Sequence, residues 1–199
     1  MIARELITND VPPIRSSETV EKALNWLDEF KVTHLAVVDG TQYQGLISEN
    51  ILYDAASSDM TIAELNVPLN RPFVYEDRHI YEVMKMVSEM QLSIAPILDK
   101  SDNYIGMTTL PALMNLISNT TSISEPGSVI VLELNQNDYS LGHLAQIIEG
   151  DDTKILSTYI TSATDSTLME VTIKVNRKNI QGVLQALARY DYVVNASYS

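Results

Sequence analysis

Two hydroxyl side chains stand at corresponding places in the sequence, and they are the residues best placed to do chemistry. Ser48 closes the segment Gly45-Leu-Ile-Ser48, and Thr109 closes Gly106-Met-Thr-Thr109. Each follows an apolar stretch of strand length and precedes a helical pattern, so each hydroxyl can accept a hydrogen bond from the first turn of a helix. Pro111, at an early helical position, strengthens this capping role for Thr109.

Catalytic patterns are absent from the sequence. The chain has no cysteine, which excludes disulfides, thiolate metal sites and cysteine nucleophiles. His34, His79 and His143 are scattered without metal-ligand spacing, so we expect no metal site. There is neither a Gly-x-Ser-x-Gly nucleophile elbow nor a glycine-rich phosphate loop of the Walker or Rossmann type. We therefore expect a protein that is not an enzyme and that needs no cofactor.

Composition restricts the partners. A formal net charge of −13 repels polyanions, so neither nucleic acid nor an anionic membrane surface is expected as a partner. No apolar run approaches the length of a membrane span, and the N-terminus lacks the pattern of a signal peptide, so we expect a cytoplasmic protein. One small phosphorylated ligand remains compatible with this charge, because a local cluster of backbone N–H groups can hold an anion.

The two hydroxyl positions belong to an internal duplication. Thr33-His-Leu-Ala-Val-Val-Asp39 and Ser93-Ile-Ala-Pro-Ile-Leu-Asp99 are related by an offset of 60 residues. Each is followed by a short loop and by one of the Gly-x-x-Ser/Thr segments. The same offset preserves apolar character over most of sixty residues, which indicates two copies of one structural unit.

Both copies show the same order of predicted elements, β-α-β-β-α after a short leading helix. In the first copy, an apolar stripe from Val20 to Phe30 at helical spacing predicts an amphipathic helix. We place the first copy at residues 1–57 and the second at 58–118, with strands at 34–38, 43–47, 94–98 and 103–107 and closing helices at about 49–56 and 110–117.

The last third of the chain has a different pattern. Residues 119–127 form a polar linker that ends in Pro-Gly. Residues 128–199 show the order β-α-β-β-α-β, with a hairpin loop at 162–166. This order is typical of the ferredoxin-like arrangement, a four-stranded antiparallel sheet with two helices on one face. The predicted fold class of the whole chain is α+β.

The duplicated unit resembles the CBS domain, and the tandem resembles a CBS pair, or Bateman module. The resemblance is carried by Ala36-Val-Val-Asp39 and Ala95-Pro-Ile-Leu-Asp99, together with the two Gly-x-x-Ser/Thr segments. Residues 128–199 look like an ACT domain, with Ser140-Leu-Gly142-His-Leu-Ala145 at the start of a helix. The whole chain is similar to the acetoin-utilisation protein B type of regulatory protein.

This resemblance implies a nucleotide site. CBS pairs bind adenosine-containing ligands such as AMP, ADP or ATP in clefts between the two units. The Ser/Thr position contacts phosphate, and an acidic residue three positions further on holds the ribose hydroxyls. Here the acidic positions are occupied by Ile51 and Ala112. The candidate nucleotide-binding residues are Ser48, Thr109, Thr108, His34, Ala36, Ser93, Ala95, Pro96 and Arg71.

The ACT resemblance implies an amino-acid site in the loop before the first helix of that domain. An Asn/Asp-rich turn before a helix is also what capping chemistry alone produces. The candidate amino-acid-binding residues are Asn135, Asn137, Asp138, Tyr139, Ser140, Leu141 and Gly142.

Two functions follow. The first is a ligand-sensing regulatory protein, in which a nucleotide shifts the arrangement of the two CBS units and the ACT-like domain relays the signal or binds an amino acid. The second is a structural or oligomerisation module that has lost nucleotide binding. The second is favoured by Ile51 and Ala112, and would be favoured further by clefts filled with Trp26, Met107 or Met114. In both cases we expect a homodimer, because two-fold closure is the commonest symmetry.

Overall fold

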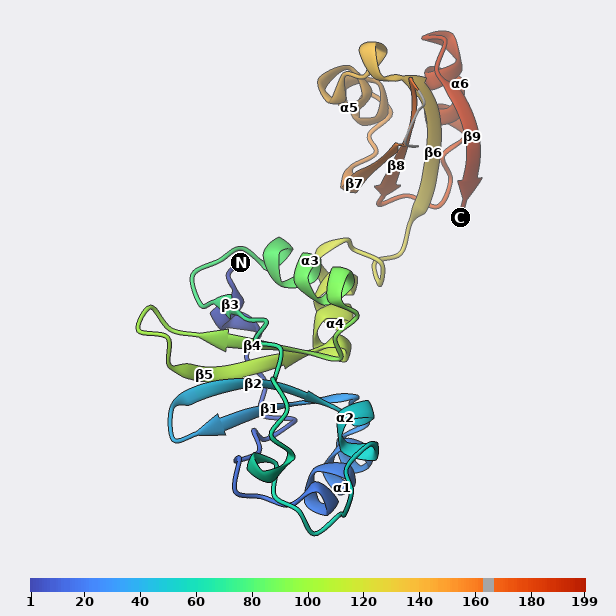
Figure 1. Ribbon diagram of the computed structural model, residues 1–199. Helices are drawn as coiled ribbons and strands as arrows, with labels where there is room; N and C mark the ends of the chain where they lie inside the picture. The colour runs from blue at the N-terminus through green and yellow to red at the C-terminus, as the bar shows by residue number, and fades with distance from the viewer. Residues whose placement is uncertain (163–166) are drawn as a thin grey trace. The chain divides into compact units, whose positions relative to one another are not determined.

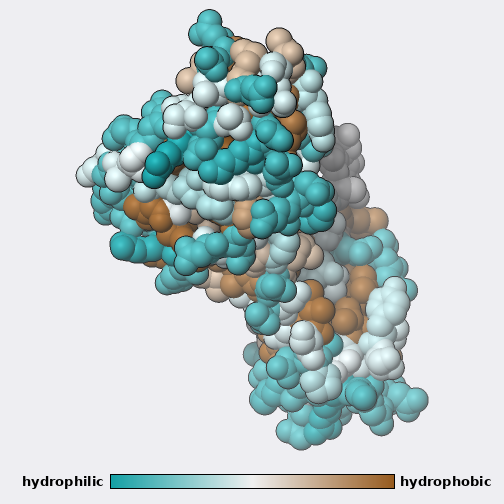
Figure 2. Space-filling view, turned by 90° about the horizontal axis from the view of Figure 1, so that it is seen from below, coloured by the Kyte–Doolittle hydropathy of each residue, from teal (hydrophilic) through white to brown (hydrophobic). Residues whose placement is uncertain are grey.

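A computed structural model describes residues 1–162 and 167–199, and most of the predicted hairpin loop at 162–166 lies outside these residues. The chain divides into two compact units, Met1–Asn115 and Leu116–Ser199 (Figure 1). Each unit has its own hydrophobic core. The face of the surface seen in Figure 2 is mainly hydrophilic, with small hydrophobic patches. Within the described residues, no helix is long and apolar enough to cross a membrane.

The first unit is built from the two sequence copies, each with a hairpin followed by a helix. β1 and β2 form one antiparallel sheet, and the parallel pair β3–β4 extends the second hairpin, β4–β5, to three strands. In the first copy, the predicted leading strand is reduced to a parallel bridge between Ile14 and Val37. The elements are α1 (Val20–Phe30), β1 (His34–Asp39), β2 (Gln42–Ser48), α2 (Glu49–Tyr53), β3 (Val74–Tyr75), α3 (Ile80–Met90), β4 (Ile94–Leu98), β5 (Tyr104–Thr109) and the start of α4 (Leu110–Thr120), with 3-10 helices at Ala3–Leu6 and Ala63–Leu65.

The duplication extends to the ends of the helices. α1 begins at Thr19, whose side chain accepts a hydrogen bond from the N–H of Lys22 at 3.2 Å. The corresponding helix α3 begins at His79. Both helices end at a left-handed residue, Lys31 with φ of 54° and Gln91 with φ of 52°, again 60 positions apart.

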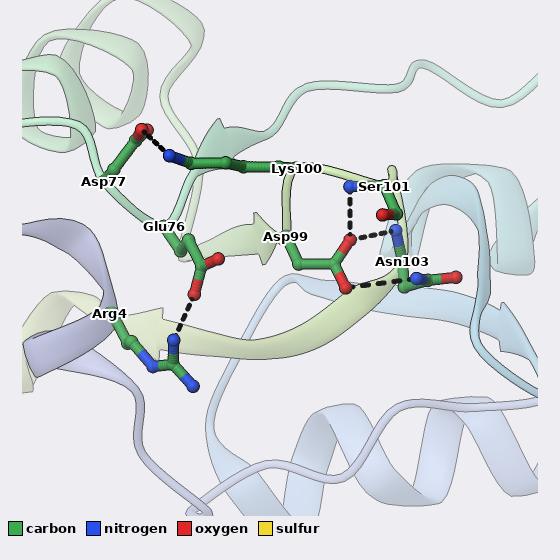
Figure 3. Close-up of polar contacts among 7 residues, drawn as sticks. All are labelled: Arg4, Glu76, Asp77, Asp99, Lys100, Ser101 and Asn103. Carbon is green, nitrogen blue, oxygen red and sulfur yellow. Dashed lines mark hydrogen bonds and ion pairs between the residues drawn. The ribbon is translucent and has the colours of Figure 1, made fainter.

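The segment that leads each copy packs against the other copy. At the N-terminus, the N–H of Ala3 donates to the carbonyl of Arg78 at 2.8 Å. In the connection between the copies, the N–H of Ile62 donates to the carbonyl of Glu18 at 2.9 Å. Figure 3 shows a side-chain contact of the N-terminal segment with the second copy, the ion pair between Arg4 and Glu76 at 2.7 Å. Residues of both copies therefore contribute to one core.

Gly45 and Gly106 allow this exchange. Both have positive φ, 149° and 152°. A Cβ atom at Gly45 would lie 2.6 Å from the Cβ of Leu69, and one at Gly106 would lie 2.5 Å from Cγ2 of Ile7. The glycines of the repeated motif thus serve the close approach of the exchanged segments.

The second unit has the order β-α-β-β-α-β. Its sheet runs β7-β8-β6-β9 with all neighbours antiparallel, which is the ferredoxin-like arrangement predicted from the sequence. Ile130 and Leu132 of β6 face the two packed helices and form the core with them. The elements are β6 (Ser128–Asn135), α5 (Leu141–Glu149), β7 (Ile155–Ser162), β8 (Leu168–Val175), α6 (Gln181–Arg189) and β9 (Val193–Tyr198), with a 3-10 helix at Gln136–Asp138.

Candidate functional site

Ser48 and Thr109 occupy the same place in the two hairpins. Ser48 ends β2 opposite His34, and Thr109 ends β5 opposite Ile94. A helix follows directly in both cases, α2 after Ser48 and α4 after Thr109. The predicted positions at the turn from strand to helix are therefore observed in both copies.

Ser93 joins the two copies at this place. Its Oγ accepts hydrogen bonds from the backbone N–H of Thr33 at 3.0 Å and from that of His34 at 3.1 Å. Thr33 and Ser93 correspond at the 60-residue offset, so equivalent residues meet across the pseudo-twofold axis. We call the group of polar residues around this point the axial cluster; it consists of Thr33, His34, Ser48, Ser93 and Thr109.

The two hydroxyls at the strand-to-helix turns differ in their bonding. Oγ1 of Thr109 accepts a hydrogen bond from the N–H of Ala112 at 3.4 Å, so the predicted cap is present. Ser48 makes no side-chain bond to the helix that follows it, so the predicted cap is wrong there. Its hydroxyl is consequently the more available of the two for another partner.

His34 lies half-buried in the axial cluster. Its Nδ1 is 3.0 Å from Oγ1 of Thr33 and 3.4 Å from Oγ of Ser93. Burial lowers the pKa of His34, and the negative charge of Glu49 opposes this effect in part. The imidazole is therefore held toward its neutral form, and an anion at the axial cluster would be bound by hydroxyl and N–H donors.

The residues of β4 and β5 that were predicted for the nucleotide site lie on both faces of the hairpin. Thr108 lies opposite Ala95, and both are fully buried. Because successive residues of a strand point to opposite faces, these two lie on the other face from Thr109. Among the described residues, Oγ1 of Thr108 has no hydrogen-bond partner, and neither has Oγ1 of Thr8.

The other residues predicted for the nucleotide site lie along the strands. Ala36 pairs with Leu46 in the first hairpin, and Pro96 pairs with Met107 at a related place in the second. Ala36, on β1, lies two positions after His34, and Pro96, on β4, lies three positions after Ser93.

Arg71 is held away from the axial cluster. Its Nε donates to the carbonyl of Tyr43 at 3.0 Å, and its guanidinium lies 5.6 Å from the ring centroids of Tyr43 and Phe73. Tyr43 is near the start of β2, whereas Ser48 ends that strand. The structure therefore joins Thr33, His34 and Ser93 by hydrogen bonds and pairs Ser48 with His34 in the strand register, but it does not bring Arg71 to them.

Ile51 and the three residues that could fill the clefts differ in how far they are buried. Ile51, at one of the acidic positions of the motif, packs against the core of the first unit. Met107 is only 1% exposed in that core, and Trp26 packs against it. Met114 is 58% exposed. Ile51 thus has a packing role at the position where the resemblance implies a ribose contact.

The loop predicted as an amino-acid site is stabilised by its own capping bonds. The side chain of Asn135 accepts from the N–H of Asn137 at 3.4 Å, and Oγ of Ser140 accepts from the N–H of His143 at 3.3 Å. Tyr139 packs against the core of the second unit. Local capping chemistry therefore accounts for the side-chain bonds of this loop.

A cavity of about 490 Å³ lies beside this loop. Asn135 and Asp138 line it, whereas residues 139–142, including Leu141 and Gly142, do not. Tyr190 and Tyr192, which follow α6, complete its wall and were not foreseen from the sequence. No local signal could identify them, because Tyr192 reaches its partner His143 across 49 positions of the chain.

Comparison with known proteins agrees with the geometry of the first unit. Residues 3–58 match the family model of the CBS domain. The second copy repeats the matched unit at an offset of 60 residues, and the two copies share one core, so the first unit has the fold of a CBS domain pair. The resemblance of the repeated motifs to the CBS domain is confirmed, as is the α+β fold class, whereas the resemblance to the acetoin-utilisation protein B type stays a prediction.

Three solved structures illustrate this similarity. A CBS domain pair/ACT domain protein from Thermotoga maritima is 22% identical, with a TM-score of 0.54, over 60% of this chain and 98% of its own. The CBS domains of a transcriptional regulator from Streptococcus pneumoniae are 16% identical, with a TM-score of 0.50, over 58% and 98%. CBSX2, solved in complex with AMP, is 19% identical, with a TM-score of 0.50, over 59% and 96%. At these identities the similarity defines the fold.

Proposed function

We propose that this protein is a non-catalytic regulator whose CBS pair senses an adenosine-containing nucleotide, such as AMP, ADP or ATP, at the axial cluster. The observation that carries the proposal is the Ser93 hydroxyl, which binds the backbone of the first copy at the point where both Gly-x-x-Ser/Thr segments end. A ligand at this point touches both copies. The AMP complex of a protein with the same fold supports the choice of nucleotide.

The proposed mechanism is a change in the arrangement of the two copies. A nucleotide that binds one arrangement better than another shifts the equilibrium by no more than that difference in affinity. Allosteric coupling is typically about 1–3 kcal/mol, so modest affinity is sufficient. The C-terminal unit relays the change or senses a second small molecule, and the working protein is a cytoplasmic homodimer.

Calorimetric titration with AMP, ADP, ATP, NAD and S-adenosylmethionine tests this proposal, with thermal unfolding as a second readout. A nucleotide at about 100 times its Kd contributes about 2.7 kcal/mol, which raises Tm by roughly 5–10 °C for a chain of this size. Thr109→Val removes the hydroxyl and should weaken binding about tenfold. Thr41→Val, in the exposed loop between β1 and β2, is the matched control and should bind normally. No binding of any of these compounds at millimolar concentration would contradict the proposal.

A structural or oligomerisation module is the second candidate, because Ile51 packs into the core at an acidic position of the motif. In that case the nucleotide panel has no effect and light scattering still gives the mass of a dimer. A monomeric mass at micromolar concentration would contradict both the module and the homodimer.

A further inference from the structure

The cavity of about 490 Å³ in the second unit lies where the end of β6 meets the turn between α6 and β9. Cavities of this size hold small organic molecules. Leu134 and Asn135 come from β6, and the residues from Tyr190 to Val193 come from the turn and the start of β9. The cavity is therefore built on the central strand and an edge strand of the sheet.

The charges that line the cavity are all negative. Glu133, Asp138 and Asp191 contribute three carboxylates, and no lysine or arginine is among the described lining residues. None of the three forms an ion pair with another residue of the described chain. An anionic ligand would be repelled here, whereas a cation would be attracted by exposed carboxylates that have no ion-pair partner in the described chain.

Aromatic rings form the wall beside these carboxylates. The hydroxyl of Tyr192 and Nδ1 of His143 are 2.8 Å apart. The rings of His143 and Tyr190 meet edge to face, with centroids 5.2 Å apart. Burial raises the pKa of Tyr192, and the negative charge of Asp138 adds to this effect. The electrostatic field of Asp138 therefore acts on the aromatic wall. Tyrosine faces attract cations, and here the hydrogen bond and ring contact fix their positions.

Exposed apolar side chains line the cavity beside the carboxylates, which are exposed as well. Leu168, Tyr190 and Val193 all line it, and they are 44%, 57% and 57% exposed. Exposed apolar groups gathered around a cavity are typical of a surface that a ligand covers. They can bury the carbon stem of a ligand.

Two other ligand classes fit the cavity less well. In the first turn of α5, residues 141 and 142 do not line the cavity, and the N–H of His143, which does, already donates to Oγ of Ser140, so a carboxylate has no helix terminus to bind. No group of three acidic or histidine side chains in the described residues is close enough to hold a metal ion.

We infer that this cavity binds a small organic cation, with its amine or guanidinium group among the carboxylates and its short apolar stem against the rim of Leu168 and Val193. This inference deepens the proposed function, because it gives the C-terminal unit a second ligand of stated chemistry, and it differs from the amino-acid ligand implied by the family resemblance.

A matched series of five-carbon ligands tests the inference on the intact protein by calorimetric titration. Cadaverine carries two amines, glutarate two carboxylates and pentane-1,5-diol two hydroxyls on comparable stems. We expect cadaverine to bind and the other two not to bind. Asp138→Asn and Asp191→Asn should each weaken cadaverine binding at least tenfold. Asp191 has φ of 62°, a conformation that asparagine also tolerates, so the turn is retained.

Asp152→Asn is the control for general attraction to an acidic protein. Asp152 has the similar φ of 52°, lies outside the cavity lining and pairs with Arg177, so its variant removes one negative charge from the same kind of backbone without changing the cavity. Equal weakening by Asp152→Asn and Asp191→Asn, equal or better binding of glutarate, or no cadaverine binding would each overturn the inference. AMP titrated into the same samples reports on the first unit, so failure of the nucleotide proposal is recognised separately.

Discussion

At the scale of single residues, His34 links the stability of the first unit to pH. Burial lowers the pKa of His34 from its ordinary value of 6.5, so the unfolded chain binds a proton more readily than the folded one. The stabilisation is therefore fully present above about pH 6.5 and is lost as the pH falls through the lower pKa of the folded state. A neutral ring is also what the hydroxyl of Thr33 requires if it is to donate to Nδ1.

We predict that His34→Gln removes this part of the pH dependence. The variant has no titrating group at this position, and its amide oxygen can still accept a hydrogen bond. Urea unfolding at pH 7.5 and pH 5.5 should show a larger loss of stability in the wild type than in the variant. The other two histidines, His79 and His143, are common to both proteins and cancel in the comparison. Identical losses would show that His34 does not titrate differently on folding.

The sequence predicted part of the candidate site at this scale. Ser48 and Thr109 were found because a repeat marks equivalent positions without any knowledge of structure. The bond from Ser93 to the backbone of Thr33 was not foreseen, since it depends on how the copies meet. The cavity residues Tyr190 and Tyr192 were missed for a similar reason, because only the fold of the sheet brings them to β6.

At the scale of elements, the apolar patterns predicted the helices and strands well, but the ends of helices differ. α2 ends at Tyr53, before the predicted 56, whereas α4 continues to Thr120, beyond the predicted 117. The left-handed residues after α1 and α3 had no sequence signal, because lysine and glutamine occupy positions where glycine is usual.

Gln91→Gly should therefore stabilise the first unit. A left-handed conformation costs a residue with a Cβ about 1–2 kcal/mol, whereas glycine costs about 0.5–1 kcal/mol through the entropy of the unfolded chain. The net gain should be roughly 0.5 kcal/mol, measured as a higher midpoint of urea unfolding. Met90→Gly, inside the last turn of α3, is the control and should destabilise. A loss of stability in Gln91→Gly would show that its side chain makes a contribution larger than the backbone strain.

At the scale of the whole first unit, the duplication was evident in the sequence but the exchange of leading segments was not. An offset of 60 residues is satisfied equally well if each leading segment packs on its own copy. The exchange makes the copies interdependent, since residues 2–8 complete the second copy and residues 58–70 complete the first. The interdependence of the copies can be tested at Gly45, because the segment 58–70 passes directly over this residue.

We predict that Gly45→Ala destabilises the first unit by about 2–3 kcal/mol. A Cβ at this position would lie 2.6 Å from the Cβ of Leu69 and 2.8 Å from the carbonyl oxygen of Asn70, both close to the backbone and unable to move freely. Gly40→Ala is the matched control: its φ is 67°, but no atom lies within 4 Å of the added Cβ, so it should cost only about 1 kcal/mol.

Hydrogen exchange locates the effect of the substitution. The N–H of Leu46 donates to the carbonyl of Asn70 at 2.8 Å, so this amide should lose protection in Gly45→Ala and keep it in Gly40→Ala. Because the first unit has one shared core, we expect the protection of β4 and β5 to fall together with that of β2. Loss confined to the first copy would mean that the two copies unfold independently, and the exchanged segments would then not couple them.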